Sequence, residues 1–167
     1  MTEYYVRPVE TEDVPFLWEM LYASLHTQAG DEPLEPEIVY SSELSKYVEG
    51  WGRAEDFGYI AVDTLGRRLG SITLRLYDEQ NAGYGYVNAA TPEMGMAVIE
   101  EARGKGLGTL LMQAALDEAR QRGIQAVSLS VDPSNNAAIR LYRRFGFEEM
   151  GMCGTSITML CRLHPAL

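Results

Sequence analysis

The sequence predicts an α/β protein in which helices pack on the faces of one mixed sheet. Segments with the alternating or continuous apolar pattern of strands are interleaved along the chain with segments of helical periodicity. No internal repeat, low-complexity tract or long linker divides the 167 residues. This length suits one domain, and we expect residues 1–167 to form it.

The first part of the chain predicts one strand and two helical segments. YYVRPV alternates as an opening strand does, and TEDVPFLWEMLYASLH follows with helical spacing, with Thr11 or Asp13 as a candidate N-cap. A shorter helical segment is expected from Pro36, closed by Gly50 and Gly52. The expected apolar face of the first helix consists of Val14, Leu17, Trp18, Leu21 and Leu25.

The remaining elements follow in a regular order. FGYIAVD and RRLGSITLRLYD predict two strands joined by the hairpin signal TLGR, and residues 79–92 predict a loop with an aromatic patch. Residues 93–100 and 125–132 predict buried strands, separated by a helix over 106–122 that ends at Gly123. A helix from Asn135 to about Phe145 and a strand pair near 147–163 complete the chain.

Composition excludes several classes of function. The formal net charge of −10 disfavours nucleic acids and anionic membranes as partners, and it is compatible with cationic small molecules. No apolar run approaches 18 residues, and the acidic N-terminus lacks the apolar core of a signal peptide, so a cytoplasmic protein is expected. Cys153 and Cys161 lack neighbours at metal-ligand spacing, which favours reduced structural thiols and no metal site.

The stretch EARGKGLGTLL, Glu101 to Leu111, predicts an anion site. It joins a strand to a helix whose first turn has unpaired N–H groups and a dipole that favours negative charge. Gly104, Gly106 and Gly108 let the backbone approach phosphate oxygens, and Arg103 and Lys105 add positive charge.

Spacing excludes two nucleotide-binding motifs at this turn. The Walker A pattern fails because Ile99 stands where its first glycine is required and Gly106 follows Lys105. The dinucleotide fingerprint fails at Thr109 or at Leu111, depending on where it starts. The pattern R-x-x-G-x-G remains, and a turn that binds no ligand stays open as an alternative.

A second motif, NNAAIRLYRRFGF, spaces Asn135, Ala138, Tyr142, Gly146 and Phe147 at offsets 0, 3, 7, 11 and 12. Together the two motifs resemble the GNAT superfamily of N-acetyltransferases, with Glu100 in place of the proline usual before the glycine-rich turn. The resemblance extends over residues 93–147. It implies a mixed, mostly antiparallel central sheet, with splayed parallel strands at the cofactor site and helices on both faces.

The resemblance implies acetyl-CoA as the cosubstrate. The pantetheine arm is expected to hydrogen-bond the backbone of the strand at Met96, Ala97 and Val98. Asn135 is expected to reach the cofactor from the opposite wall, unless it serves only as an N-cap. The residues expected to cradle the pyrophosphate are Arg103, Gly104, Lys105, Gly106, Leu107, Gly108 and Thr109.

The implied reaction is direct acetyl transfer to a primary amine of a small molecule or peptide. Tyr142 is the candidate general acid for the thiolate, and Glu93 is the candidate base, with packing and a solvated strand end as their respective alternatives. A covalent intermediate on Cys153 or Cys161 is not expected. His26 and His164 are not favoured as bases.

The acceptor is left open by the sequence. Three acidic residues and four aromatic residues are candidates to border its site, although core or surface positions suit them better: Glu19, Asp31, Glu32, Trp18, Tyr22, Tyr84 and Tyr86. The acidic composition suggests a cationic amine as one hypothesis. A non-catalytic acyl-CoA sensor or partner domain of the same fold is the alternative to an enzyme, and a homodimer is an open possibility because dimers are common in similar proteins.

Overall fold

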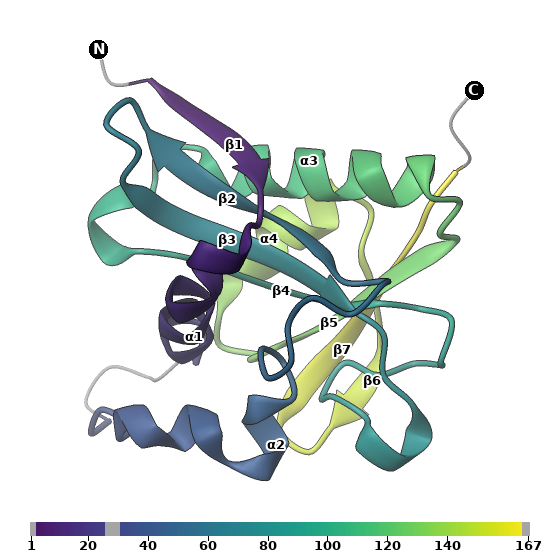
Figure 1. Ribbon diagram of the computed structural model, residues 1–167. Coiled ribbons are helices and arrows are strands. Elements are labelled where there is room, and N and C mark those ends of the chain that lie inside the picture. Colours follow the sequence, from purple (N-terminus) through teal and green to yellow (C-terminus); the bar gives the residue numbers. More distant parts are fainter. Residues whose placement is uncertain (1–2, 26–30, 165–167) are drawn as a thin grey trace.

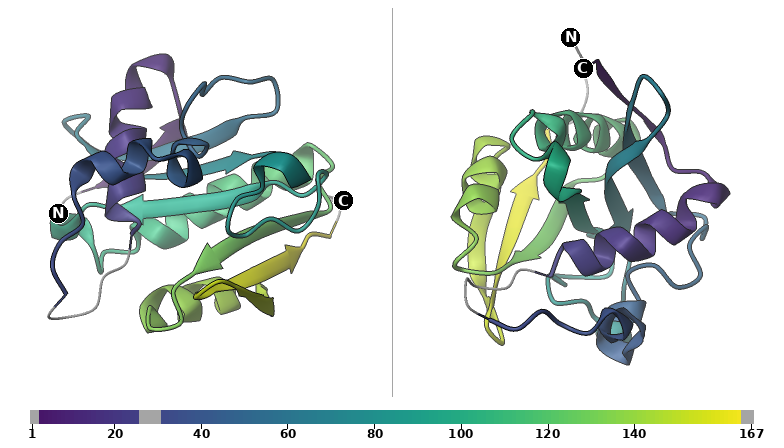
Figure 2. Two further views of the ribbon diagram at one scale, coloured as in Figure 1. Left: turned by 90° about the horizontal axis from the view of Figure 1, so that it is seen from below. Right: turned by 90° about the vertical axis from the view of Figure 1, so that its left-hand side faces the viewer.

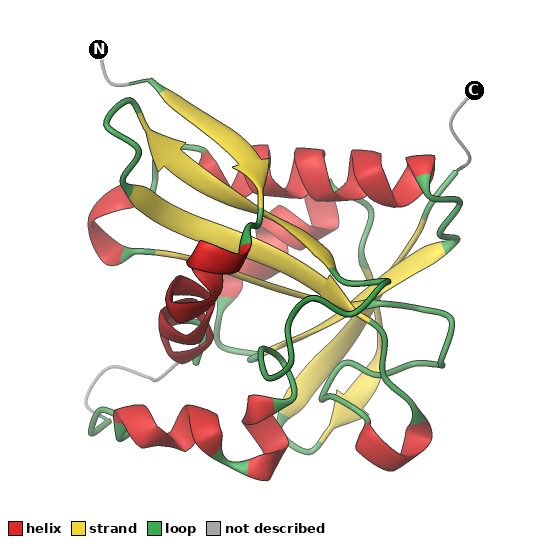
Figure 3. Cartoon of the chain, in the orientation of Figure 1, coloured by secondary structure: helices red, strands yellow, loops and turns green. Residues whose placement is uncertain are grey.

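The computed structural model describes residues 3–25 and 31–164, which form a seven-stranded sheet with helices on both faces (Figures 1 and 3). The strand order is β1-β2-β3-β4-β5-β7-β6. The strands are β1 (Tyr4–Pro8), β2 (Phe57–Asp63), β3 (Arg68–Arg75), β4 (Glu93–Val98), β5 (Ala126–Val131), β6 (Glu148–Cys153) and β7 (Ser156–Arg162). The helices are α1 (Val14–Ala23), α2 (Ser42–Ser45), α3 (Leu107–Gln121) and α4 (Asn136–Arg144).

All neighbouring strands are antiparallel except β4 and β5. These two parallel strands share a single ladder pair, Glu93 with Ser128, whereas β4 pairs with β3 over its whole length. One edge of β4 therefore lies without a neighbouring strand beyond Glu93. The expected mixed sheet with splayed parallel strands is confirmed.

The side-chain alternation of β2 determines which helices cover which face. Ile60 and Val62 point to the face where α1 packs, while Phe57 and Ala61 point to the face where α3 and α4 pack. Figure 2 shows this division, with α1 and α2 on one side of the sheet and α3 and α4 on the other. The larger of the two apolar clusters lies under α3 and α4.

Helix α3 begins and ends at glycines, as the sequence predicted. Gly106 is its N-cap with φ +83°, and Gly123 follows its last turn with φ +76°, a region that residues with a Cβ rarely adopt. The apolar side of α3 is fully buried against the sheet, with Leu111, Met112 and Ala115 at 0% exposure. The helix thus holds the glycine-rich turn rigidly at one end of β4.

The predicted face of α1 differs from the observed one. Phe16, Leu17 and Met20 are its buried residues, whereas Val14, Trp18 and Leu21 are half-buried. Helix α1 lies between the sheet and the segment that contains α2, so it has apolar side chains on two sides. Periodicity alone does not distinguish these two sides.

The cap residue of α1 has a different role from the expected one. The Asp13 side chain makes no cap hydrogen bond to α1; it accepts bonds from Arg7 at 2.7 Å and 2.9 Å and from Arg68 at 2.7 Å. Asp13 is completely buried, and burial would raise its pKa, but Arg7, the Glu10 amide and Arg68 together hold that pKa well below its usual range. This ion pair joins the start of α1 to β1 and β3.

The segment expected as one helix from Pro36 is divided in two. Residues Pro36–Tyr40 form a 3₁₀ turn, and α2 follows after Ser41, which is extended at φ −64° and ψ 155°. Over residues 3–25 and 31–164, no helix has both the length and the apolar character needed to cross a bilayer.

Candidate active site

A cleft of about 790 Å³ opens where β4 and β5 separate. One wall carries β4 and the glycine-rich turn, and another carries the end of β5 and α4. The rest of the lining comes from α1, from α2 and its flanking segments, from Ser71 and Thr73 of β3, and from the loops at Tyr84 and Thr155. The cleft therefore joins the residues of both sequence motifs to the N-terminal helical segments.

The glycine-rich turn lines one end of the cleft. Gly104 and Gly106 have φ values of +75° and +83°, and a Cβ at either position would meet no atom within 4 Å. Gly106 also leaves the first turn of α3 without a side-chain cap. Backbone N–H groups at a helix start that face open space form a suitable seat for phosphate oxygens.

The structure brings five of the residues predicted for the pyrophosphate into the cleft lining: Arg103, Gly104, Gly106, Leu107 and Gly108. The Arg103 side chain also donates from Nε to the Val98 carbonyl at 3.2 Å, which places the guanidinium next to β4. Lys105 and Thr109 are exposed and do not appear in the lining. The pyrophosphate role of all seven residues stays a prediction.

The free edge of β4 passes along the same cleft. Met96, Ala97 and Val98 are half-buried and line it, and their backbone pairs with β3 on one side only. An extended ligand arm can hydrogen-bond such an edge as an added strand does. The residues present thus suit a pantetheine arm followed by a diphosphate.

Glu93 lies at the start of β4, is only 4% exposed and lines the cleft. Its Oε2 accepts a hydrogen bond from the Tyr47 phenol at 2.8 Å, and its Oε1 is buried without a hydrogen-bond partner among the described residues. Burial raises the pKa of Glu93 to about 7, although Tyr47, the nearby Gly85 amide and the Lys46 ammonium oppose this rise. A carboxylate with this pKa that lines the cleft is suited to accept a proton near neutral pH.

Tyr47 is held against Glu93 by contacts with two tyrosines that come later in the chain, Tyr77 and Tyr84. Its phenol oxygen accepts a hydrogen bond from the Tyr84 amide at 2.8 Å, and its ring packs edge-on against Tyr77 at 5.6 Å between centroids. Burial raises the pKa of Tyr47 far above its ordinary value, with Glu93 adding to the rise, so Tyr47 stays a hydrogen-bond donor.

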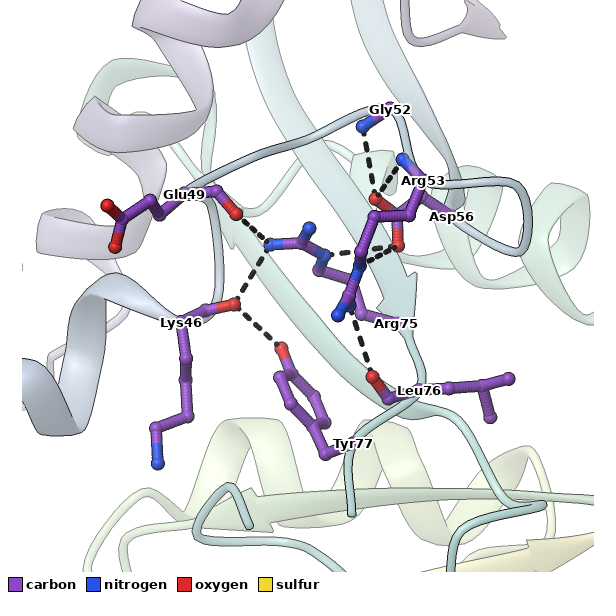
Figure 4. A network of polar contacts seen from close by, with 8 residues as sticks. All are labelled: Lys46, Glu49, Gly52, Arg53, Asp56, Arg75, Leu76 and Tyr77. Carbon is purple, nitrogen blue, oxygen red and sulfur yellow. Dashed lines mark hydrogen bonds and ion pairs between the residues drawn. The ribbon is translucent and has the colours of Figure 1, made fainter. Parts of the chain in front are cut away.

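Arg75 fixes the turn that carries Tyr47 (Figure 4). Its Nη1 donates to the carbonyl oxygens of Lys46 and Glu49, each at 2.9 Å, and its Nε pairs with Asp56 at 3.1 Å. Arg75 is 2% exposed and is the ladder partner of Glu93 in β3. The sequence predicts a role for neither Arg75 nor Tyr47, because no motif links them to a residue that is remote along the chain.

Tyr142 and Asn135 line the opposite wall of the cleft. Tyr142 is 8% exposed, its phenol makes no hydrogen bond to a described residue, and burial raises its pKa to about 12. Its ring also packs against Phe147 at 5.9 Å, so packing accompanies its place in the cleft. The Asn135 side chain accepts a hydrogen bond from the Ala138 amide at 3.3 Å, which confirms its predicted N-cap position.

Most of the residues considered for the acceptor site lie outside the lining of the cleft. Tyr84 lines the cleft, whereas Tyr22 and Tyr86 do not, and Trp18 stacks on Tyr40 at 4.9 Å instead. Glu19 lines a separate hollow with Arg67 and Arg68, and Asp31 and Glu32 are exposed. Of the remaining candidates, Cys153 is exposed, Cys161 is buried, His164 is exposed, and His26 lies outside the described residues.

Comparison with known proteins decides the family. The family model described as "Acetyltransferase (GNAT) family" matches residues 18–147. This chain belongs to the GNAT family. The resemblance stated from the two motifs is thereby confirmed, and the GNAT chain uses the cosubstrate of its family, acetyl-CoA.

Curated relatives of this GNAT chain act on different acceptors. An L-methionine sulfoximine/L-methionine sulfone acetyltransferase of Pseudomonas aeruginosa is 35% identical over 92 residues, 55% of this chain and 51% of that protein. N-alpha-acetyltransferase 30 of Schizosaccharomyces pombe is 32% identical over 109 residues, 65% of this chain and 67% of that protein. The matched part thus spans about half the length of the bacterial relative.

Solved structures share the fold over nearly the whole GNAT chain. A GCN5-related N-acetyltransferase from Kribbella flavida has a TM-score of 0.68 at 25% identity and covers 96% of this chain and 98% of that one. The PaiA N-acetyltransferase from Thermoplasma acidophilum, solved with coenzyme A, has a TM-score of 0.69 at 19% identity, covering 96% and 99%. The second likeness concerns the fold alone.

Proposed function

We propose that this protein transfers the acetyl group of acetyl-CoA to a primary amine by direct attack. The observation that carries the proposal is that one cleft is lined by Glu93, Tyr142 and the glycine-rich turn. A base, an acid and a seat for the cofactor phosphates are the three parts that direct acetyl transfer requires.

Glu93 takes a proton from the ammonium group of the acceptor, directly or through one water molecule. The freed amine attacks the thioester carbonyl carbon, a C–N bond forms and the C–S bond breaks. Tyr142 donates its phenol proton to the departing sulfur, and the second proton that the nitrogen loses as the amide forms returns to the Tyr142 phenolate, directly or through water. The raised pKa values of both groups suit these roles, because Glu93 binds a proton near neutral pH and Tyr142 retains one until it is needed.

The alternative function is an acyl-CoA sensor or partner domain. Both functions require cofactor binding, but only the enzyme requires a base at the cleft. The burial of the Glu93 carboxylate at the cleft lining favours the enzyme, because a sensor gains nothing from desolvating a carboxylate there.

The test is release of thiol from acetyl-CoA in the presence of a panel of primary amines. The expected result is amine-dependent release that falls roughly 10²-fold or more in Glu93→Gln. A matched control is Glu101→Gln, an exposed carboxylate paired with Arg67 at 3.2 Å. Tight acetyl-CoA binding with no release for any amine would instead identify a sensor.

A further inference from the structure

The part of the cleft formed by the N-terminal segments is largely apolar. We call this part the acceptor end. It lies beyond β4 from the glycine-rich turn and is built from α1, the segment around the 3₁₀ turn, and α2 with the turn after it. Its lining is mostly aliphatic, with Ser24 and Tyr47 as its polar members; the apolar residues are Leu17, Met20, Leu21, Ala23, Leu25, Leu34, Ile38, Leu44 and Val48.

Charged side chains are few along the described lining of the cleft. They are Glu93, Arg103 and Asp132. Arg103 belongs to the glycine-rich turn, and Asp132 follows β5, where it accepts bonds from the Ser134 amide at 2.8 Å and hydroxyl at 2.6 Å. Both stand with the residues expected to hold the cofactor, so Glu93 is the charged group next to the acceptor end.

Four charged side chains of the N-terminal segments lie near the acceptor end but do not line the cleft. The Lys46 ammonium donates to the Ala82 carbonyl at 2.8 Å and is not part of the lining. Glu19 faces the separate hollow that it shares with Arg67 and Arg68, on another side of α1. Glu35 and Glu37 are exposed and line neither space.

This arrangement penalises any second charge on the acceptor. Among the described residues that line the acceptor end, a second ammonium would lose its hydration with no carboxylate to replace it, and a carboxylate would lose its hydration with no cation of the lining to pair with. Apolar groups are favoured, because each buried methylene improves binding by about fourfold. Glu93 can pair with one ammonium group, and that group contains the nitrogen that reacts.

We propose that the acceptor is a small primary amine with an apolar body and no second charged group. The proposal rests on the function proposed above. It replaces the hypothesis of an acceptor steered by acidic side chains, because the carboxylates that suggested it do not line the cleft.

Two matched pairs of amines test the proposal through thiol release. Pentylamine is compared with 1,5-diaminopentane, which adds only a second ammonium, and leucinamide with leucine, which differs by a carboxylate. Values of kcat/KM, calculated per concentration of unprotonated amine, are expected to favour pentylamine and leucinamide by at least tenfold. Equal or better use of either doubly charged partner overturns the proposal.

The same pairs distinguish failure of this inference from failure of the proposed function. Calorimetry measures their binding to the protein saturated with coenzyme A. If no amine releases thiol, the proposed function fails, but tighter binding of pentylamine than of 1,5-diaminopentane still supports the apolar acceptor end. Binding without preference overturns it.

A gain of specificity gives an independent test. Leu34 lines the cleft at its rim and is 37% exposed, so Leu34→Glu adds a carboxylate that stays in contact with water. The ratio of 1,5-diaminopentane to pentylamine, in kcat/KM or in affinity, is expected to rise at least tenfold. Leu65→Glu is the control, because Leu65 is 92% exposed at the β2–β3 turn. An unchanged ratio in Leu34→Glu, with coenzyme A affinity retained, contradicts the proposal.

Discussion

The Tyr47 phenol donates a 2.8 Å hydrogen bond to Oε2 of Glu93, across 46 positions of sequence. This bond stabilises the ionised form of a carboxylate whose burial favours the protonated form. Tyr47 therefore acts as a positioning residue, since it orients the candidate base and limits the rise of its pKa.

Replacing Tyr47 by Phe removes that hydrogen bond and keeps the ring. The pKa of Glu93 should rise above about 7 by roughly one to two pH units, because a hydrogen bond to a charged group contributes about 1.5–3 kcal/mol. The rising limb of log kcat/KM against pH should move to higher pH by the same amount. Tyr59→Phe is the control, since its phenol bonds Glu118 at 2.6 Å, away from the cleft. An unmoved pH profile in Tyr47→Phe would show that the bond does not tune the base.

Glu93 should also make folding stability depend on pH. Its folded pKa of about 7 exceeds the ordinary value of 4.5, so the folded protein binds more protons than the unfolded chain between these pH values. The free energy of unfolding should fall by up to about 3 kcal/mol as pH rises from about 4.5 through 7. Glu93→Gln should lack this fall. Denaturant unfolding at several pH values measures it, and parallel curves for the two proteins would refute the shift.

Tyr142→Phe tests the proton donor. Turnover should drop by roughly 10²-fold, because the departing thiolate loses its acid, while coenzyme A affinity stays close to that of the parent. The ring packing on Phe147 is retained in this variant, so the fold is expected to persist. Single-turnover rates give the comparison, and an equal chemical rate would assign Tyr142 to packing alone.

Substitutions at two glycines with similar positive φ values distinguish an effect on cofactor binding from an effect on folding stability. Gly106 and Gly123 both have positive φ and open space at the Cβ position, but Gly106 lines the cleft and Gly123 does not. Ala at either site should cost about 1 kcal/mol of stability. Gly106→Ala should in addition weaken coenzyme A binding by about tenfold, which calorimetry measures. Equal affinities in the two variants would remove the glycine-rich turn from the phosphate site.

Local patterns were sufficient to predict most elements. The strand over 57–63 is predicted to the residue, and α3 starts and ends at the glycines that the sequence indicates. The buried side of α1 was predicted wrongly around Phe16 and Met20, because a helix with apolar neighbours on two sides has no single apolar face. The break after Tyr40 likewise has no strong sequence signal.

The candidate site was predictable only where motif spacing identifies it. Glu93 and the glycine-rich turn lie at opposite ends of one predicted strand, so the strand and turn pattern places both along the same edge of the sheet. Tyr47 and Arg75 reach Glu93 through the pairing of β3 with β4 and through backbone carbonyl contacts. Such contacts depend on tertiary structure and leave no periodic signature in the chain.

The single ladder pair between β4 and β5 has a consequence for the lifetime of the protein in a cell. Two strands that share one ladder pair separate more easily than the antiparallel strand pairs beside them. Proteases cleave chains that open in this way. A cofactor bound across these two strands would hold the two halves of the sheet together and favour the closed form by mass action. Resistance of this protein to proteolysis should therefore increase with the concentration of acetyl-CoA.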